Sequence, residues 1–355
     1  MSKAFTRQHL LLALLLITIP GVQAQQQSGW RFSNRLQTGW EYDSNVFESI
    51  DMAETAQSIR FLLQSRTSHQ GRAAYFQLSY SGGLQLYPNL PIDNKLINQV
   101  RSSARFTLNP RITLVAETWA RLKIFLNRET DYGLAYLRPY INFKMTNRFS
   151  LQVGGGVEGL DYAGSDFFDY SAPFVFVDFS CHVSPALSIK PKFRYKLTRM
   201  QRKAFAITPD GSTWYQIDEP QNDRGRSYGL QMDYYRNGLL INLSFFYEAS
   251  ASNSYGADYD RQVIVLALAR QFSFATVRLY GTLQQKNYRD QLLPFWPIIS
   301  DTEEEKSNFL ILDISRQLSS HAILSARASA FKNESPDARF YYQKGLFALN
   351  IEFLF

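Results

Sequence analysis

Cationic side chains at every second position of one segment are the residues best placed to bind an anion. This cationic ladder consists of Lys190, Lys192, Arg194 and Lys196. Successive side chains of an extended strand point to opposite faces, so all four share one face. Rows of Lys and Arg favour anions by lowering the electrostatic barrier to their passage. In a second interpretation, neighbouring carboxylates pair with these cations, which then only keep a polar interior soluble.

Two further pairs of cations each share one parity. They are Arg121 with Lys123, two positions apart, and Arg101 with Arg105, four positions apart. If the apolar faces of these segments meet lipid, basic residues outnumber acidic ones on the opposite, inward face. The expected inward acids are Glu41, Glu117, Glu158, Asp233, Glu248 and Glu352. We expect the cationic ladder to be the part of this face that is hardest to neutralise locally.

Residues for nucleophilic or metal chemistry are sparse. The chain has four His and one Cys, Cys181, so no disulfide can form within it. His9 lies in the N-terminal segment, while His69, His182 and His321 fall at expected short turns. Three separated His and one Cys do not form a zinc-binding pattern. The sequence therefore predicts no catalytic residue, no metal site and no cofactor.

Strands must position these charges, because apolar residues recur at every second position in sixteen segments. The first runs from Trp30 to Tyr42 and the last from Phe347 to Phe355. The pattern predicts an all-β fold, a closed antiparallel transmembrane β-barrel of about 16 strands, with 14 to 18 as the range. A soluble β-sandwich also has alternating strands, but many of these segments reach twelve residues or more against a usual ~5–6.

Short and long connections alternate along the chain. An even strand number with this alternation predicts short periplasmic turns, longer external loops and both termini in the periplasm. Two long loops stand out, at 200–224 and 287–305. The first is expected to fold inward as a constriction. The second contains the apolar run LLPFWPII and then Asp301 and Glu303 to Glu305, and is expected to plug the lumen, to lie on the membrane or to contact a partner.

Three prolines lie inside predicted strands: Pro139, Pro173 and Pro191. Proline lacks the amide donor that a sheet ladder needs and is tolerated mainly at edges and bulges. Each therefore predicts a local bulge, with a lateral opening between strands as the alternative.

The N-terminal 24 residues have the pattern of a cleaved secretory signal peptide. Lys3 and Arg7 precede an apolar run at 10–19, which Pro20 and a Val22-Gln23-Ala24 cleavage pattern follow. We expect residues 25–355 to form a single barrel domain. The whole chain carries 38 Lys and Arg against 31 Asp and Glu, an excess too mild to imply a nucleic-acid partner.

The C-terminal segment keeps one parity to its last residue: Phe347, Leu349, Ile351, Phe353 and Phe355. It resembles the terminal recognition strand of bacterial outer-membrane proteins, which implies a Gram-negative outer-membrane location and the barrel-assembly machinery as a partner. The stretch Tyr42-Asp43-Ser44-Asn45-Val46-Phe47 resembles one found near the start of porins associated with exopolysaccharide systems. This resemblance covers six residues and assigns no functional residue.

Together these features predict a porin-like channel for anionic small molecules or an anionic polysaccharide, in contact with the outer membrane and its lipopolysaccharide. The alternative is a non-conducting barrel for surface-component export, assembly or adhesion with periplasmic partners. An outer-membrane lipid-modifying enzyme is the weaker alternative. Neither the solute nor the oligomeric state follows from the sequence.

Overall fold

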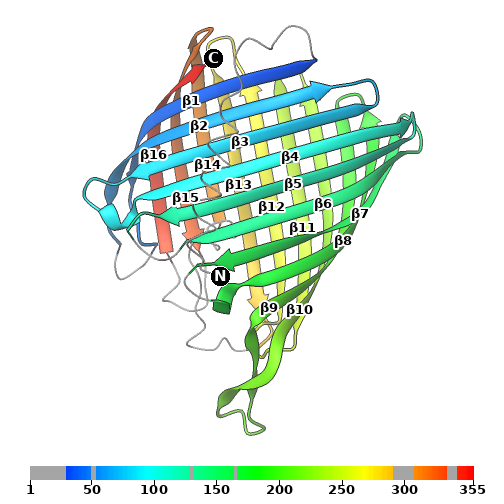
Figure 1. The fold of residues 1–355 in the computed structure, drawn as a ribbon, viewed down its shortest axis with the longest axis vertical. Coiled ribbons are helices and arrows are strands. Elements are labelled where there is room, and N and C mark those ends of the chain that lie inside the picture. The colour runs from blue at the N-terminus through cyan, green and yellow to red at the C-terminus, as the bar shows by residue number, and fades with distance from the viewer. Residues whose placement is uncertain (1–28, 49–52, 128–130, 164–165, 291–307, 334–341) are drawn as a thin grey trace, which may run out of the picture.

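The computed structural model of the chain is one closed antiparallel sheet of sixteen strands (Figure 1). It describes residues 29–48, 53–127, 131–163, 166–290, 308–333 and 342–355. The predicted signal peptide, the apolar run of the 287–305 loop and the acidic residues after it lie outside these ranges. The predicted fold class is confirmed.

The strands follow one another around the barrel in chain order. Their bounds are β1 Trp30–Asp43, β2 Ala56–Gln70, β3 Ala74–Leu86, β4 Lys95–Asn109, β5 Ile112–Phe125, β6 Tyr132–Lys144, β7 Phe149–Tyr162, β8 Tyr170–Ser184, β9 Leu187–Ile207, β10 Trp214–Arg236, β11 Leu239–Ser252, β12 Tyr259–Gln271, β13 Thr276–Tyr288, β14 Asn308–Ser319, β15 Ala322–Asn333 and β16 Tyr342–Leu354. Two 3₁₀ turns, η2 (Pro91–Asp93) and η3 (Asp166–Phe168), lie in long connections.

Period-two alternation separates the two faces of this sheet. Apolar side chains of one parity are exposed on the outside, as Trp40 and Tyr42 are on β1 and Phe347 and Leu349 are on β16. The C-terminal residues Phe353 and Phe355 are exposed on the same outer face. Polar and charged residues of the other parity face the lumen. Because a one-residue slip would exchange the two faces, the register of every strand is strongly specified.

The first and last strands close the barrel, as the sequence predicts. In β1 and β16, Thr38 pairs with Ile351 and Trp40 with Leu349. Backbone hydrogen bonds of 3.0 and 3.1 Å join Asn34 and Phe355 in both directions. The terminal Phe355 therefore takes part in the seam that closes the sheet.

Residues of the Tyr42–Phe47 motif bind the start of β16. The Asp43 carboxylate lies 3.2 Å from Lys344 Nζ, which also pairs with Glu48 at 2.8 Å. Asn45 Nδ2 donates to the carbonyl of Gln343 at 3.1 Å. The Ser44 amide donates to the Gly345 carbonyl, and the Ser44 hydroxyl accepts from the Gly345 amide. We call these contacts of residues 43–48 with residues 343–345 the clasp. The motif thus holds the first and last strands together at one end of the barrel.

The connections alternate in length as predicted. Strands β2 and β3, for example, are joined through residues 71–73, whereas β1 and β2 are joined through residues 44–55. We call the end with the short connections, where β1 begins and β16 ends, the turn end, and the opposite end the loop end. Which end faces the periplasm stays a prediction.

The prediction of a loop at 200–224 is wrong, because most of this segment belongs to β9 and β10. Beyond the Tyr170–Met200 pair, β9 pairs with β10 alone, and the two form a ribbon that projects past the loop end (Figure 1). The base of the ribbon packs against a neighbouring connection: Ala204 and Phe205 are buried, and the Phe205 amide donates to the Ser254 hydroxyl. Since the ribbon lies past the barrel and has no lipid face, its sequence lacks the apolar alternation that marks the other strands. It projects away from the barrel and does not fold inward as a constriction.

The tip of this ribbon is the Pro209-Asp210-Gly211 turn that the sequence contains. Gly211 has a φ of +71°, a conformation that favours glycine. The hydroxyls of Ser212 and Thr208 donate to the Asp210 carboxylate and lower its pKa to about 2. The tip therefore keeps its negative charge at any physiological pH.

Substitution of Lys344 tests the clasp. Lys344→Met leaves Asp43 and Glu48, which are 2% and 6% exposed, without their shared cation. Breaking a buried ion pair by removing one partner costs about 3–5 kcal/mol of unfolding free energy. Denaturant unfolding of the protein folded in detergent micelles, followed by tryptophan fluorescence, measures this loss.

The matched control is Lys203→Met on the projecting ribbon. Lys203 pairs with Asp218 at 2.8 Å, but both side chains are largely exposed. Solvent screens this exposed pair, so we expect the stability of Lys203→Met to stay close to that of wild type. A Lys344→Met protein as stable as this control would refute the structural role of the clasp.

Candidate functional site in the barrel lumen

The strand registers place all eight sequence-predicted cations on the inward face. These are Lys190, Lys192, Arg194 and Lys196 on β9, Arg121 and Lys123 on β5, and Arg101 and Arg105 on β4. Exposed apolar residues occupy the opposite parity of the same strands, for example Phe106 on β4 and Leu114 on β5. The site is therefore the charged wall of the lumen.

The cationic ladder is largely neutralised. Lys190 Nζ lies 2.6 Å from Asp233 Oδ2 on β10. Glu158 on β7 accepts from Arg194 at 3.0 Å and from Lys196 at 2.9 Å. Our expectation that the ladder is the part hardest to neutralise is wrong for three of its four cations.

The reason lies on the strand between the partners. Glu158 is two strands away from the ladder, and Ala172 of β8, which is fully buried, pairs with it. An alanine at this position leaves the long Arg194 and Lys196 side chains room to reach across β8. Lys192 makes no ion pair with any described residue.

Aromatic rings complete this network. The Arg194 guanidinium carbon lies 3.8 Å from the centre of the Phe174 ring, and that of Arg138 lies 3.9 Å from the Phe176 ring. Each guanidinium also binds a carboxylate, since Arg194 binds Glu158 and Arg138 binds Asp178, both at 3.0 Å. A guanidinium held between a ring and a carboxylate has little freedom to move, so this wall is a packed structure.

Sequence reasoning missed several members of the lumen network. Arg138 shares its inward face with Tyr136 and Tyr140, so β6 is apolar on both faces and its parity does not reveal which one is inward. Asp178 alternates with Phe174 and Phe176 on β8 and is hidden in the same way. Asp313, which binds Arg278 and Arg327 at 3.2 and 3.4 Å, shares its inward face with Phe309 and Ile311 on β14, so its parity is unclear as well.

The wall formed by β2 to β4 differs from the ladder in three of its arginines, although Arg60 of β2 pairs with Glu41. Arg66, Arg101 and Arg105, which we call the arginine wall, make no ion pair among the residues that the structure describes. Arg66 Nη2 donates to the side-chain oxygen of Gln77 at 2.6 Å, and the Arg105 guanidinium lies 5.6 Å from the Tyr75 ring centre. Neutral amides and rings orient these cations without cancelling their charge.

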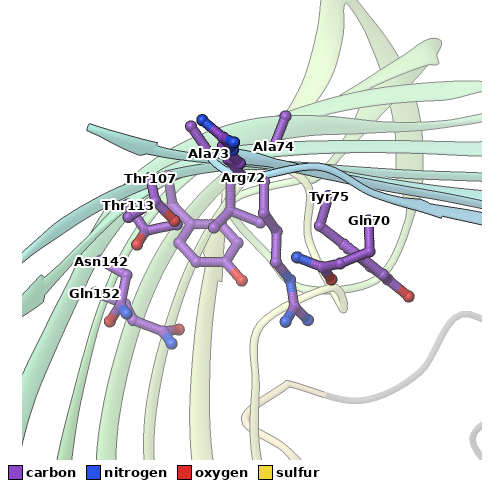
Figure 2. Close-up of a pocket in the computed structure, with 12 residues that line it drawn as sticks. Gln70, Arg72, Ala73, Ala74, Tyr75, Thr107, Thr113, Asn142 and Gln152 are labelled. Carbon is purple, nitrogen blue, oxygen red and sulfur yellow. The ribbon is translucent and has the colours of Figure 1, made fainter. Parts of the chain in front are cut away.

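A cavity of about 460 Å³ opens from the arginine wall at the turn end of the lumen (Figure 2). Thr107, Thr113, Asn142 and Gln152 lie along one side of it, and Gln70 and Tyr75 lie along the other. Arg72 and Arg105 also line it, and no carboxylate does. Its chemistry is therefore cationic and rich in hydroxyl and amide groups.

The three histidines outside the N-terminal segment lie at or near the turn end. His69 packs against the Trp30 ring at 4.8 Å, and His321 Nδ1 hydrogen-bonds the adjacent Ser320 hydroxyl at 2.7 Å. His182 is near the end of β8. Within the described ranges, no cluster of His, Cys, Asp and Glu could hold a metal ion. No helix in those ranges has both the length and the apolar character needed to cross a membrane.

The prolines do not produce the predicted bulges. Around Pro139, the two residue pairs between Leu137–Val157 and Tyr140–Gly154 are missing from the β6–β7 ladder. The register of the two strands is nevertheless the same on both sides of this gap. Pro173 and Pro191 interrupt the β8–β9 ladder in the same manner. At the first interruption the strands lie close together, because a Cβ atom at Gly156 would overlap the carbonyl oxygen of Leu137. At each interruption, two residue pairs are missing between strands that are paired on both sides of the gap.

Comparisons with known proteins give a similar fold and no sequence family. The sequence matches no protein-family profile and no curated protein sequence. Among solved structures, the chain is similar to Acinetobacter baumannii OccAB3, with a TM-score of 0.48 and 9% identity, over 92% of this chain and 99% of that one. It is also similar to Pseudomonas aeruginosa OccK8 (OprE), with a TM-score of 0.46 and 10% identity, over 92% and 98%.

A third similar structure is a bacterial polysaccharide outer membrane secretin, with a TM-score of 0.43 and 7% identity, over 91% of this chain and 98% of that one. The chain's own architecture defines its class. A closed sheet of sixteen antiparallel strands, with apolar residues outside, charges inside and alternating short and long connections, is the architecture of an outer-membrane β-barrel.

Removal of Glu158 tests whether the ladder is a packed network. Glu158→Gln keeps the size of the side chain but leaves Arg194 and Lys196 close together without their shared carboxylate. Hydrogen bonds to charged groups contribute about 1.5–3 kcal/mol. Since Arg194 and Lys196 are about a third exposed, solvent screens them and we expect a loss of about 1–2 kcal/mol in unfolding free energy.

Glu219→Gln on the exposed ribbon is the control, because Glu219 makes no ion pair with a described residue; its stability should stay within about 0.5 kcal/mol of wild type. The loss in Glu158→Gln should shrink at high salt, because added ions screen the repulsion between the two cations. Equal stability of the two variants would show that the ladder needs no counter-charge.

Proposed function

We propose that the protein is a passive outer-membrane channel that favours anions. The observation that carries this proposal is the arginine wall, three lumen guanidinium groups without a carboxylate partner among the described residues. The paired ladder on the opposite side contributes mainly through Lys192. Selectivity then comes from the difference between the two walls, and no bond is made or broken in the solute.

The size of the barrel supports passage. Side chains fill the interior of an eight-stranded barrel, whereas barrels of 16–18 strands leave an aqueous channel. Charges of one sign on the low-dielectric wall of such a channel concentrate counter-ions near it. The arginine wall therefore raises the local concentration of anions along β2 to β4 and lowers that of cations.

Reversal potentials in planar bilayers under a potassium chloride gradient test the proposal. Wild-type protein should conduct in steps and prefer chloride. A unit charge about 8 Å from the ion path contributes about 0.5 kcal/mol in water before screening by salt. The triple variant Arg66→Gln, Arg101→Gln, Arg105→Gln should therefore lower the chloride-to-potassium permeability ratio by about threefold or more.

The double variant Lys190→Gln, Asp233→Asn is the matched control. It removes an ion pair from the opposite wall and leaves the net charge unchanged, so its permeability ratio should equal that of wild type. Cation preference in the wild type, or a triple variant that is as selective as the control, would overturn the assignment. A folded protein that never conducts would favour the export or assembly alternative.

A further inference from the structure

The cavity at the turn end has the chemistry of a binding site. We infer that it binds a hydroxylated anion of sugar size, whose charged group is a carboxylate or a phosphate. This inference rests on the proposed channel and names the class of solute for which the lumen is built.

The charge of the cavity requires an anion. Arg105 and Arg72 line it, and neither makes an ion pair with a residue in the described ranges. Glu117 is on the inward face of β5 near Arg105, but other residues bind it. Tyr140 Oη donates to it at 3.1 Å, and Arg138 Nη1 lies 3.7 Å from its other oxygen. The two arginines therefore present their charge to the cavity.

The polar lining requires hydroxyl groups on the same ligand. Asn142 Oδ1 is buried and accepts no hydrogen bond from the described part of the chain. Figure 2 shows Asn142 beside Gln152, Thr107 and Thr113 on one side of the cavity. The hydroxyls of Thr107 and Thr113 and the amide of Gln152 can exchange hydrogen bonds with hydroxyl groups of a ligand in the cavity. A simple anion such as chloride or acetate has no hydroxyl to donate.

The position of Arg105 suits recognition as well as attraction. The Arg105 guanidinium carbon lies 5.6 Å from the centre of the Tyr75 ring, a cation–π contact that favours some orientations of the guanidinium over others. Arginine in a fixed plane binds a carboxylate or a phosphate through two parallel hydrogen bonds. The volume of about 460 Å³ lies in the range of ~300–1,000 Å³ that is usual for small-molecule sites. A single sugar ring with one acidic group fits these requirements together.

Isothermal titration calorimetry on the purified full-length protein in detergent tests the inference with four probes. D-glucuronate carries a carboxylate and hydroxyls, and glucose 6-phosphate carries a phosphate and hydroxyls. Glucose lacks the charge, and acetate lacks the hydroxyls. We expect saturable binding of at least one of the first two, and binding of glucose and acetate at least about tenfold weaker. Which of the two anions binds more tightly distinguishes a carboxylate site from a phosphate site.

Variants assign the binding to this cavity. Arg105→Gln should weaken binding of the preferred anion about tenfold, and Arg105→Lys should restore part of the loss because it keeps the charge. Asn142→Leu should weaken the hydroxylated anion and leave the weak binding of acetate unchanged. The double variant Lys190→Gln, Asp233→Asn should bind as wild type does, and circular dichroism shows that each variant retains its β-structure.

Three results would overturn the inference: no saturable binding of either hydroxylated anion, acetate binding as tightly as glucuronate, or unchanged affinity in Arg105→Gln. Chloride selectivity in bilayers without glucuronate or glucose 6-phosphate binding would remove this site and leave the proposed channel intact. Binding without any conductance would remove the channel and leave the site.

Discussion

The need to pair every backbone amide and carbonyl in lipid is the constraint on which the whole structure depends. The hydrocarbon core offers no water to an open sheet edge, so a membrane-spanning sheet must close on itself. Here β16 meets β1, and backbone hydrogen bonds continue to Phe355 at the end of the chain. At the other end of the seam, the Asp43 and Asn45 side chains bind Lys344 and the carbonyl of Gln343. Closure therefore gives a physical role to the C-terminal segment and to the Tyr42–Phe47 motif.

Closure of the barrel also determines which face of the sheet carries charged side chains. Once apolar side chains cover the outside, the charged residues of the spanning segments must face the lumen, and their neighbours there determine whether they act as structure or as an electric field. On β9 the carboxylates of Glu158 and Asp233 reach the ladder, and rings such as Phe174 hold its guanidinium in place. On β2 and β4, Arg66 and Arg105 meet Gln77 and Tyr75, which are neutral, whereas Arg60 pairs with Glu41. The lumen thus has one packed wall and one wall on which Arg66, Arg101 and Arg105 make no ion pair with a described residue.

Much of this architecture could be predicted from the sequence, because lipid on one side and water on the other produce a period-two pattern. The first predicted segment, Trp30 to Tyr42, matches β1 to within one residue, and the alternation of connection lengths is confirmed. The pattern fails where one of the two environments changes. The ribbon beyond Met200 lies past the barrel, where no face meets lipid, and its sequence resembles a loop. The inward face of β8 carries Phe174 and Phe176 beside Asp178, so its pattern is ambiguous.

The candidate site was less predictable than the fold. Strand parity shows that Lys196 and Glu158 both face inward, but their contact depends on the small Ala172 on the strand between them. Parity likewise cannot show that Arg105 makes no ion pair with a described residue. The most direct test of the proposed anion selectivity is the reversal potential of the arginine-wall triple variant beside that of wild type in the same salt gradient. We predict chloride preference in the wild type that the triple variant largely loses; an unchanged potential would contradict the proposed role of the arginine wall.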